Sequence, residues 1–306
     1  MEETMAGISA YIRIWLALLA VASSALADDA THTLRYRFTP GETVYFSSHN
    51  ETTRRYALSA HEVNTNDSVD SLKHYKVLSV TPDGGAVLEL TIDRTKMACD
   101  DGTIHFAYDS TTDKDPPDAF QEVHGTIGRP WLRVTVNALG QTTNSETPRG
   151  VKVPESADYL SRVLPVLPEE PIAIGKSWKE QVMVDVTMDQ VPVEEGQTPL
   201  KRSIKMQRVY TLQSVENGIA TLALRTEVLT PRRTPKQDVE LVQRLFRGTV
   251  TIDTVNGRLV GRDLTIDGSV LGYDGPMSVM SVKMLQKDAY VPTGAPTAVT
   301  ANAATK

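Results

Sequence analysis

The sequence predicts an all-β, mainly antiparallel protein: a long curved sheet or half-barrel built from two duplicated halves, with a few short helices. Three features indicate this fold, namely strands with alternating side chains, turn residues at regular intervals, and little helical periodicity. In the run AVLELTID, residues 86–93, every even-numbered position is apolar and three of the four odd-numbered positions are polar. Such a period of two is typical of a strand with one buried face and one face in water.

A β-hairpin occurs twice along the chain. Residues 75–93, YKVLSVTPDGGAVLELTID, match residues 210–228, YTLQSVENGIATLALRTEV, and the two copies differ in length at the turn. Hairpin turns tolerate such changes. Gly41 and Gly175 precede the two copies at nearly equal distances. We therefore predict a tandem duplication, with an insertion in the first half at about residues 96–127.

The N-terminal residues indicate export. The apolar run Ile14–Ala22 follows Arg13, and Ala25-Leu26-Ala27 fits the small-x-small cleavage pattern. We expect residues 1–27 to be a signal peptide and the mature protein to be periplasmic or secreted. A transmembrane anchor is the alternative, but it needs about 20 apolar residues and the run is shorter. After cleavage no membrane span is expected.

The first half is expected to cover residues 28–164. Its predicted elements are strands at Leu34–Phe38, Thr43–Ser48 and Thr52–Glu62, a polar loop at Asn64–Ser71, the repeated hairpin, a strand at Ile104–Tyr108, a short helix at Asp118–Thr126, a hairpin from Trp131 to Asn144, and a helix at Ser156–Leu164. The last helix is predicted because its apolar residues fall on one helical face, and Pro165 ends it.

The second half, residues 165–290, is expected to consist of long strands. They are predicted at Trp178–Met188, Ser203–Val215, Ile219–Leu229, Leu241–Asp253, Arg258–Ile266 and Ser278–Leu285. Asp238–Phe246 is ambiguous between helix and strand, and the alternation of Val242 and Phe246 with the following apolar positions favours a strand. Residues 291–306, rich in Ala, Thr and Pro, are predicted to be a disordered tail. Whether the halves form one continuous sheet or two domains stays open.

Composition narrows the classes of partner. The chain has 306 residues, 40% of them apolar, and a net charge of −6, which argues against nucleic acid as a partner. Cys99 is the one cysteine, so no internal disulfide forms, and we interpret it as a half-buried packing residue.

Motifs for catalysis are missing from the sequence. It has no Gly-x-Ser-x-Gly elbow, zinc helix, P-loop or dinucleotide fingerprint, and its six histidines lack metal-ligand spacing. We assign no catalytic residue and expect no cofactor. The candidate calcium ligands are Asp109, Asp113, Asp115 and Asp118. A solvated acidic loop is the favoured alternative because the EF-hand spacing is absent.

Three phrases resemble a family of exported bacterial β-rich proteins of unknown function. They are YDSTTDKDPPD (Tyr108–Asp118), WLRVTVNALGQ (Trp131–Gln141) and LPEEPIAIGKSW (Leu167–Trp178). The resemblance covers most of Leu34–Asp288 and rests on turn and packing residues, so it implies a fold rather than an activity. The implied fold is similar to the half-barrel of periplasmic lipoprotein carriers.

The function predicted from these features is that of an exported, non-catalytic binding protein. It would hold an apolar small molecule or a partner protein on the concave face of the sheet, with helices covering that face. The candidate ligand-binding residues are Trp131, Trp178, Tyr210 and Phe246.

Two alternatives stay open. The first is a structural or interaction protein of the cell envelope that meets its partner through Arg54, Arg55, Arg232 and Arg233. The second is a hydrolase of extracellular polymers that uses the carboxylates of Asp109, Asp113 and Asp115.

Overall fold

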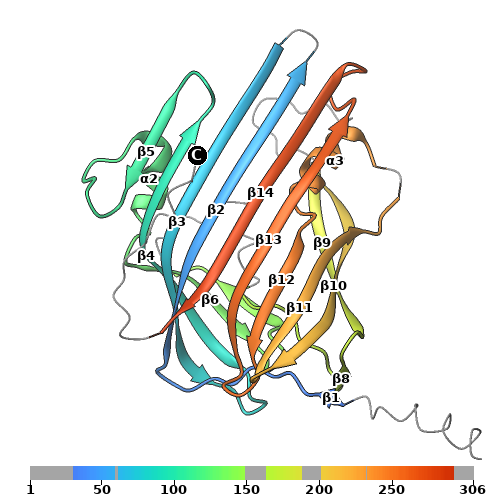
Figure 1. The fold of residues 1–306 in the computed structure, drawn as a ribbon. Helices are drawn as coiled ribbons and strands as arrows, with labels where there is room; N and C mark the ends of the chain where they lie inside the picture. Colours follow the sequence, from blue (N-terminus) through green and yellow to red (C-terminus); the bar gives the residue numbers. More distant parts are fainter. Residues whose placement is uncertain (1–29, 59–60, 149–162, 188–200, 232, 293–306) are drawn as a thin grey trace, which may run out of the picture.

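The computed structural model describes residues 30–58, 61–148, 163–187, 201–231 and 233–292. Its main element is one 12-stranded antiparallel sheet that curves around a concave face (Figure 1). The prediction of an all-β, mainly antiparallel protein with a long curved sheet is confirmed.

The first half contributes seven strands and two short helices. They are β1 (Thr31–His32), β2 (Thr43–Leu58), β3 (His61–Val80), β4 (Ala86–Asp100), β5 (His105–Asp109), the 3₁₀ helix η1 (Asp118–Phe120), α2 (Gln121–His124), β6 (Pro130–Val136) and β7 (Thr142–Glu146). The second half contributes seven strands and one helix. They are β8 (Ile172–Ala173), β9 (Ser177–Thr187), β10 (Lys201–Glu216), β11 (Ile219–Val228), α3 (Pro235–Val242), β12 (Arg247–Asp253), β13 (Arg258–Leu271) and β14 (Ser278–Val291).

The two halves form one continuous sheet. The strand order is β7-β6-β4-β3-β2-β14-β13-β12-β11-β10-β9, with β5 paired to β4 on the side. The halves join where β14 pairs with β2 along 14 residues of each strand, from Ser278↔Leu58 to Val291↔Tyr45. Among the described residues the sheet is open, with β7 and β9 as its edges. The inward side chains of both halves therefore pack into one shared core.

Equivalent backbone contacts recur in the two halves. Gly41 N donates to Val77 O at 2.8 Å, and Gly175 N donates to Leu212 O at 2.7 Å. Both glycines adopt positive φ, 81° and 82°, which glycine reaches without a Cβ clash. The register of β3–β4 shifts directly after Val77, and that of β10–β11 directly after Leu212. The tandem duplication that the sequence predicts would account for this correspondence.

Residues 34–38 are not part of a strand, so the prediction of a strand there is wrong. Their backbone groups bond to turns instead: Tyr36 N donates to Ala138 O and Arg37 N donates to Gly257 O, both at 2.9 Å. Leu34 is fully buried. This segment crosses one end of the curved sheet and ties the β6–β7 turn to the β12–β13 turn.

The polar loop predicted at Asn64–Ser71 is also wrong, because those residues lie inside β3. Each is paired with β2, and most also pair with β4. Cross-strand polar contacts replace the missing apolar pattern. Thr53 Oγ1 donates to Asn66 at 3.0 Å, and Arg54 forms an ion pair with Asp67.

The strand favoured at Asp238–Phe246 is wrong too, since α3 ends at Val242. Thr234 and Gln237 form a reciprocal capping box, and Pro235 occupies the first turn, so local capping favours the helix over the apolar alternation. Val242 packs against Gly268 of β13, where a Cβ would approach its side chain to 2.4 Å. This glycine therefore allows α3 to lie close to the sheet.

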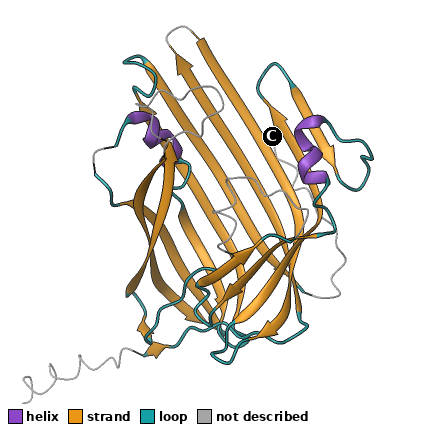
Figure 2. Ribbon diagram, turned by 180° about the vertical axis from the view of Figure 1, so that it is seen from behind, coloured by secondary structure: helices purple, strands orange, loops and turns teal. Residues whose placement is uncertain are grey.

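The short helix expected at Asp118–Thr126 is confirmed by η1 and α2. These two helices lie near one lateral edge of the curved sheet, and α3 lies near the other (Figure 2).

The helix expected at Ser156–Leu164 lies outside the described residues except for its last two, which are not helical. Val291, counted with the expected tail, ends β14, and residues 293–306 are not described. Within the described ranges, no helix is long and apolar enough to cross a membrane.

Candidate functional site

A cavity of about 430 Å³ lies on the concave side of the sheet. Its walls come from β2, β3, β4 and β6 on one side and from β10 to β14 on the other. Residues of η1, α2 and the segment Val163–Pro165 complete them. Because strands far apart in the sheet order face the same space, the curvature of the sheet creates this cavity.

Large apolar side chains form most of the cavity wall. Three of the four predicted ligand-binding residues, Trp131, Tyr210 and Phe246, line it. They come from β6, from β10 and from the connection between α3 and β12. The structure therefore brings together three aromatic residues that are widely separated in the sequence.

Trp178, the fourth predicted residue, lies behind the wall. Its ring stacks on that of Tyr210, with centroids 5.4 Å apart and planes 16° apart. Trp178 Nε1 donates to Val166 O at 2.8 Å, and Tyr210 Oη donates to Glu180 Oε2 at 3.2 Å. Trp178 thus supports the position of Tyr210 and does not itself line the cavity.

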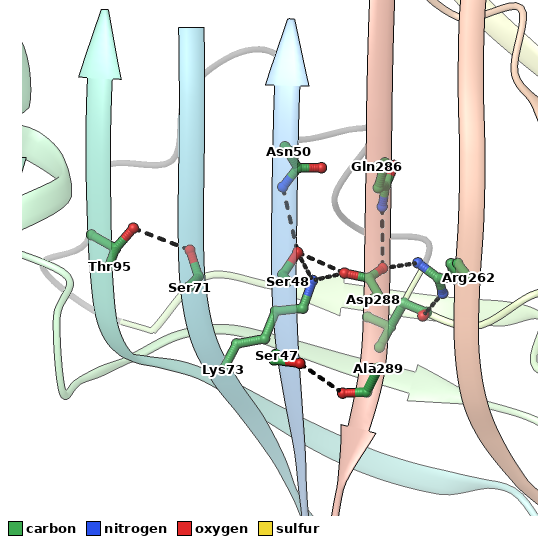
Figure 3. A network of polar contacts seen from close by, with 11 residues as sticks. Ser47, Ser48, Asn50, Ser71, Lys73, Thr95, Arg262, Gln286, Asp288 and Ala289 are labelled. Atoms are coloured by element: carbon green, nitrogen blue, oxygen red, sulfur yellow. Dashed lines mark hydrogen bonds and ion pairs between the residues drawn. The ribbon is translucent and has the colours of Figure 1, made fainter. Parts of the chain in front are cut away.

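A polar cluster interrupts the apolar wall around Asp288 (Figure 3). Ser48 Oγ donates to Asp288 Oδ1 at 2.6 Å, and Lys73 Nζ lies 3.0 Å from the same oxygen. Arg262 Nη1 lies 3.4 Å from Asp288 Oδ2, and Gln286 Nε2 donates to this second oxygen at 3.1 Å. The cluster joins β2, β3, β13 and β14, and so it spans the junction of the two halves.

Asp288 stays ionised at neutral pH. Its side chain is 2% exposed, and burial alone raises the pKa of a carboxyl group. The charges of Lys73 and Arg262, with the hydrogen bonds from Ser48 and Lys73, outweigh burial and lower the pKa of Asp288 to about 2. An anion held so firmly is a poor proton acceptor, so the cluster is suited to electrostatic binding rather than to proton transfer.

Other charges on the cavity wall have partners or face water. Arg208 lies 3.4 Å from Glu180, and His74 Nδ1 lies 2.8 Å from an oxygen of Asp93. Glu122 of α2 is exposed, so water screens its charge.

The predicted acidic residues do not converge on the cavity. Thr111 N donates to Asp109 at 2.9 Å, and Asp109 N donates to Asp113 at 2.7 Å, so these carboxylates stabilise their own loop. Asp115 and Asp118 do not line the cavity either. Among the described residues, no group of three His, Cys, Asp or Glu side chains could hold a metal ion. The calcium and hydrolase hypotheses gain no support from this arrangement.

The predicted arginine surface is engaged within the chain. Arg54 pairs with Asp67, Arg55 Nη2 lies 2.6 Å from Glu62, and Arg233 Nε lies 2.6 Å from Asp238. Arg232 lies outside the described residues. These internal ion pairs give the interaction-protein alternative no free basic patch at these described positions.

Sequence reasoning missed Lys73, Arg262 and Asp288. Asp288 occupies an inward position of β14, between residues that point outward. A charged residue on the buried face of an alternating strand is the signal that could have marked it. Its partners lie on three other strands, and the sequence alone does not align those strands.

Comparison with solved structures gives a distant likeness in fold. The translocator domain of autotransporter NalP from Neisseria meningitidis matches with 6% sequence identity and a TM-score of 0.31. The match covers 92% of this chain and 97% of that chain. No family model matches the sequence, and no curated protein matches it. The β-rich architecture implied by the family resemblance is confirmed, and membership of that family stays a prediction.

Proposed function

We propose that this chain is an exported, non-catalytic binding protein that holds an apolar small molecule in the concave cavity. One observation carries the proposal: a cavity of about 430 Å³ bordered by largely apolar walls from both halves of the sheet. Ligand pockets commonly measure about 300–1,000 Å³ and combine apolar walls with a few placed polar groups.

The aromatic residues of the wall are held in place before any ligand arrives. Tyr210 and Phe246 are 2% and 5% exposed, and Trp178 stacks behind Tyr210. Trp131 packs against the same core from β6, near the opposite edge of the sheet from β10, which carries Tyr210. A wall fixed in this way loses little conformational freedom on binding, which favours affinity.

The walls are also backed by a continuous ladder of backbone hydrogen bonds. The central strands β2, β3, β13 and β14 pair over 11 or more residues with each neighbour in this group. The folded sheet therefore fixes most of the cavity wall.

A fluorescence titration with the uncharged probe N-phenyl-1-naphthylamine tests the proposal. The wild-type chain is expected to bind the probe at micromolar concentration with increased emission. Asn50→Trp places a large side chain in the cavity and is expected to weaken binding about tenfold or more. Asn50 lines the cavity and makes one long hydrogen bond, 3.4 Å to Ser48 Oγ, so its replacement removes little.

Glu51→Trp is the matched control, since Glu51 is the next residue of β2 and points to solvent. It is expected to bind the probe like the wild type. Equal binding by the two tryptophan variants, or no binding by the wild type, would contradict a ligand site in the cavity.

A further inference from the structure

We infer that the ligand of the cavity is amphipathic and carries one anionic head group, a carboxylate or a phosphate, which binds beside Lys73 and Arg262. This inference rests on the proposed function and specifies the chemistry of its ligand. The observation behind it is an unequal number of positive and negative charges in the polar cluster.

The cluster around Asp288 holds two cations and one anion. Lys73 and Arg262 both lie within ion-pair distance of Asp288, at 3.0 and 3.4 Å. Because Asp288 stays ionised, one positive charge is left over on a largely apolar wall. An excess positive charge beside an apolar surface attracts an anion, so a ligand anion there is stabilised.

Both cations reach the cavity. Lys73 and Arg262 line it, with side chains 38% and 16% exposed, whereas Asp288 is 2% exposed. An ammonium group has three donors and a guanidinium has five. Ser48 and Asp288 accept from Lys73, and Asp288 and Val163 O accept from Arg262. Donors on each cation therefore stay open for the oxygens of a head group.

The other described charges of the wall do not cancel this surplus. Arg208 and His74 each have a carboxylate partner, and Glu122 is exposed to water. The amide groups of Asn50 and Gln286 also line the cavity near the cluster and add neutral donors.

The rest of the wall suits an apolar tail. Leu224, Val250 and Leu264 line the cavity together with Trp131 and Phe246. A cationic head group would meet two like charges, and a fully apolar ligand would leave the surplus charge without a partner. An amphipathic anion satisfies both parts of the wall.

Paired probes that differ in head-group charge test the inference. cis-Parinaric acid and its methyl ester share one fluorescent chain, and the acid is anionic at pH 7. The wild-type chain is expected to bind the acid at least tenfold more tightly than the ester. Lys73→Met is expected to remove most of this difference by weakening the binding of the acid. Lys287→Met, at the outward neighbour of Asp288, is the control and is expected to keep it.

Competition against bound cis-parinaric acid identifies the head group. Dodecanoate and dodecyl phosphate are compared with dodecanol, and stronger displacement by either anion supports the inference and names the preferred oxyanion. Equal displacement by dodecanol would overturn it.

Equal affinity of the wild type for acid and ester would overturn the head-group inference and leave the proposed function intact. Absence of binding by both probes would overturn the two together. The comparison of acid with ester needs no variant, so it decides the question even if Lys73→Met fails to fold.

Discussion

Lys73 Nζ lies 3.0 Å from Asp288 Oδ1, although β2 runs between the strands that carry them. The contact crosses the junction of the two halves, and Ser48 of the intervening strand hydrogen-bonds to Asp288 beneath it. The buried carboxylate of Asp288 therefore links strands of the two halves through ion pairs. Its two cationic partners, Lys73 and Arg262, line the cavity.

Asp288 should make the stability of the fold sensitive to acid. Its folded pKa is about 2, whereas an aspartate in an unfolded chain titrates near 3.9. Because the folded pKa is lowered, the stabilisation is complete above about pH 5 and is lost as the pH falls through about 4 towards 2. Its size is about 2 kcal/mol. Urea unfolding of the wild type at pH 7, 4 and 2.5 measures this loss.

The variant Asp288→Asn should lack that part of the acid sensitivity and should be less stable at pH 7, by about 3 kcal/mol, because two cations lose their partner. Asp263→Asn is the control, since Asp263 and its partner Lys287 are both 55% exposed. The assignment fails if the Asp288 variant and the wild type lose equal stability between pH 4 and pH 2.5.

Alanine at Gly140 should destabilise the chain far more than alanine at Gly41. Both glycines have a φ of 81°, which costs an alanine about 1 kcal/mol. At Gly140 the new Cβ would also lie 2.6 Å from the ring of Tyr36 and 2.7 Å from Pro165 O, while Gly41 has open space. We expect an additional loss of about 2 kcal/mol at Gly140. Thermal unfolding of the two variants measures it, and equal losses would argue against this packing.

The stack of Trp178 on Tyr210 should appear as an energetic coupling. A double-mutant cycle consists of Trp178→Leu, Tyr210→Leu and the double variant. The loss of the hydrogen bond from Trp178 to Val166 O is common to the single and the double variant, so it cancels from the coupling energy. Aromatic pairs contribute about 1 kcal/mol beyond their buried area, and we expect coupling of that size in urea unfolding. Tyr210→Phe keeps the ring and should lose about 1 kcal/mol with the hydroxyl. Additive single losses would mean that Trp178 does not support Tyr210.

Cys99 should react slowly with iodoacetamide. The hydrogen bond to Asp67 and partial burial raise the pKa of the thiol from its ordinary value to about 11. At pH 8 the thiolate fraction, and with it the alkylation rate, should be about 100-fold lower than for an unperturbed thiol. Asp67→Asn should increase the rate, and Asp100→Asn should not. An alkylation rate typical of a free cysteine would contradict the assignment.

The strands were predictable where one face is apolar and the other polar. Residues 86–93 and their counterpart in the second half show that pattern and form the starts of β4 and β11. β3 was harder, because its residues 64–71 form polar cross-strand pairs that resemble a loop in sequence. α3 carried a readable capping box at Thr234 and Gln237, but the apolar alternation beyond it favoured the wrong element.

The candidate site was predictable in its aromatic part only. Trp131, Tyr210 and Phe246 are large residues at strand or turn positions, and curvature of the sheet brings them to one cavity. The cluster of Lys73, Arg262 and Asp288 depends on the lateral order of β3, β2, β14 and β13. Since β14 pairs with β2 across more than 200 residues of chain, local patterns do not reveal which charges meet.

Native mass spectrometry of the protein purified from its own host shows whether the concave cavity carries a ligand. We expect a bound small apolar or amphipathic molecule whose mass is lost on extraction with organic solvent. We also expect the bound mass in Glu51→Trp and its absence in Asn50→Trp, whose new side chain fills the cavity. An unliganded mass for the wild-type chain, or equal occupancy in the two tryptophan variants, would contradict a ligand-binding role for the concave cavity.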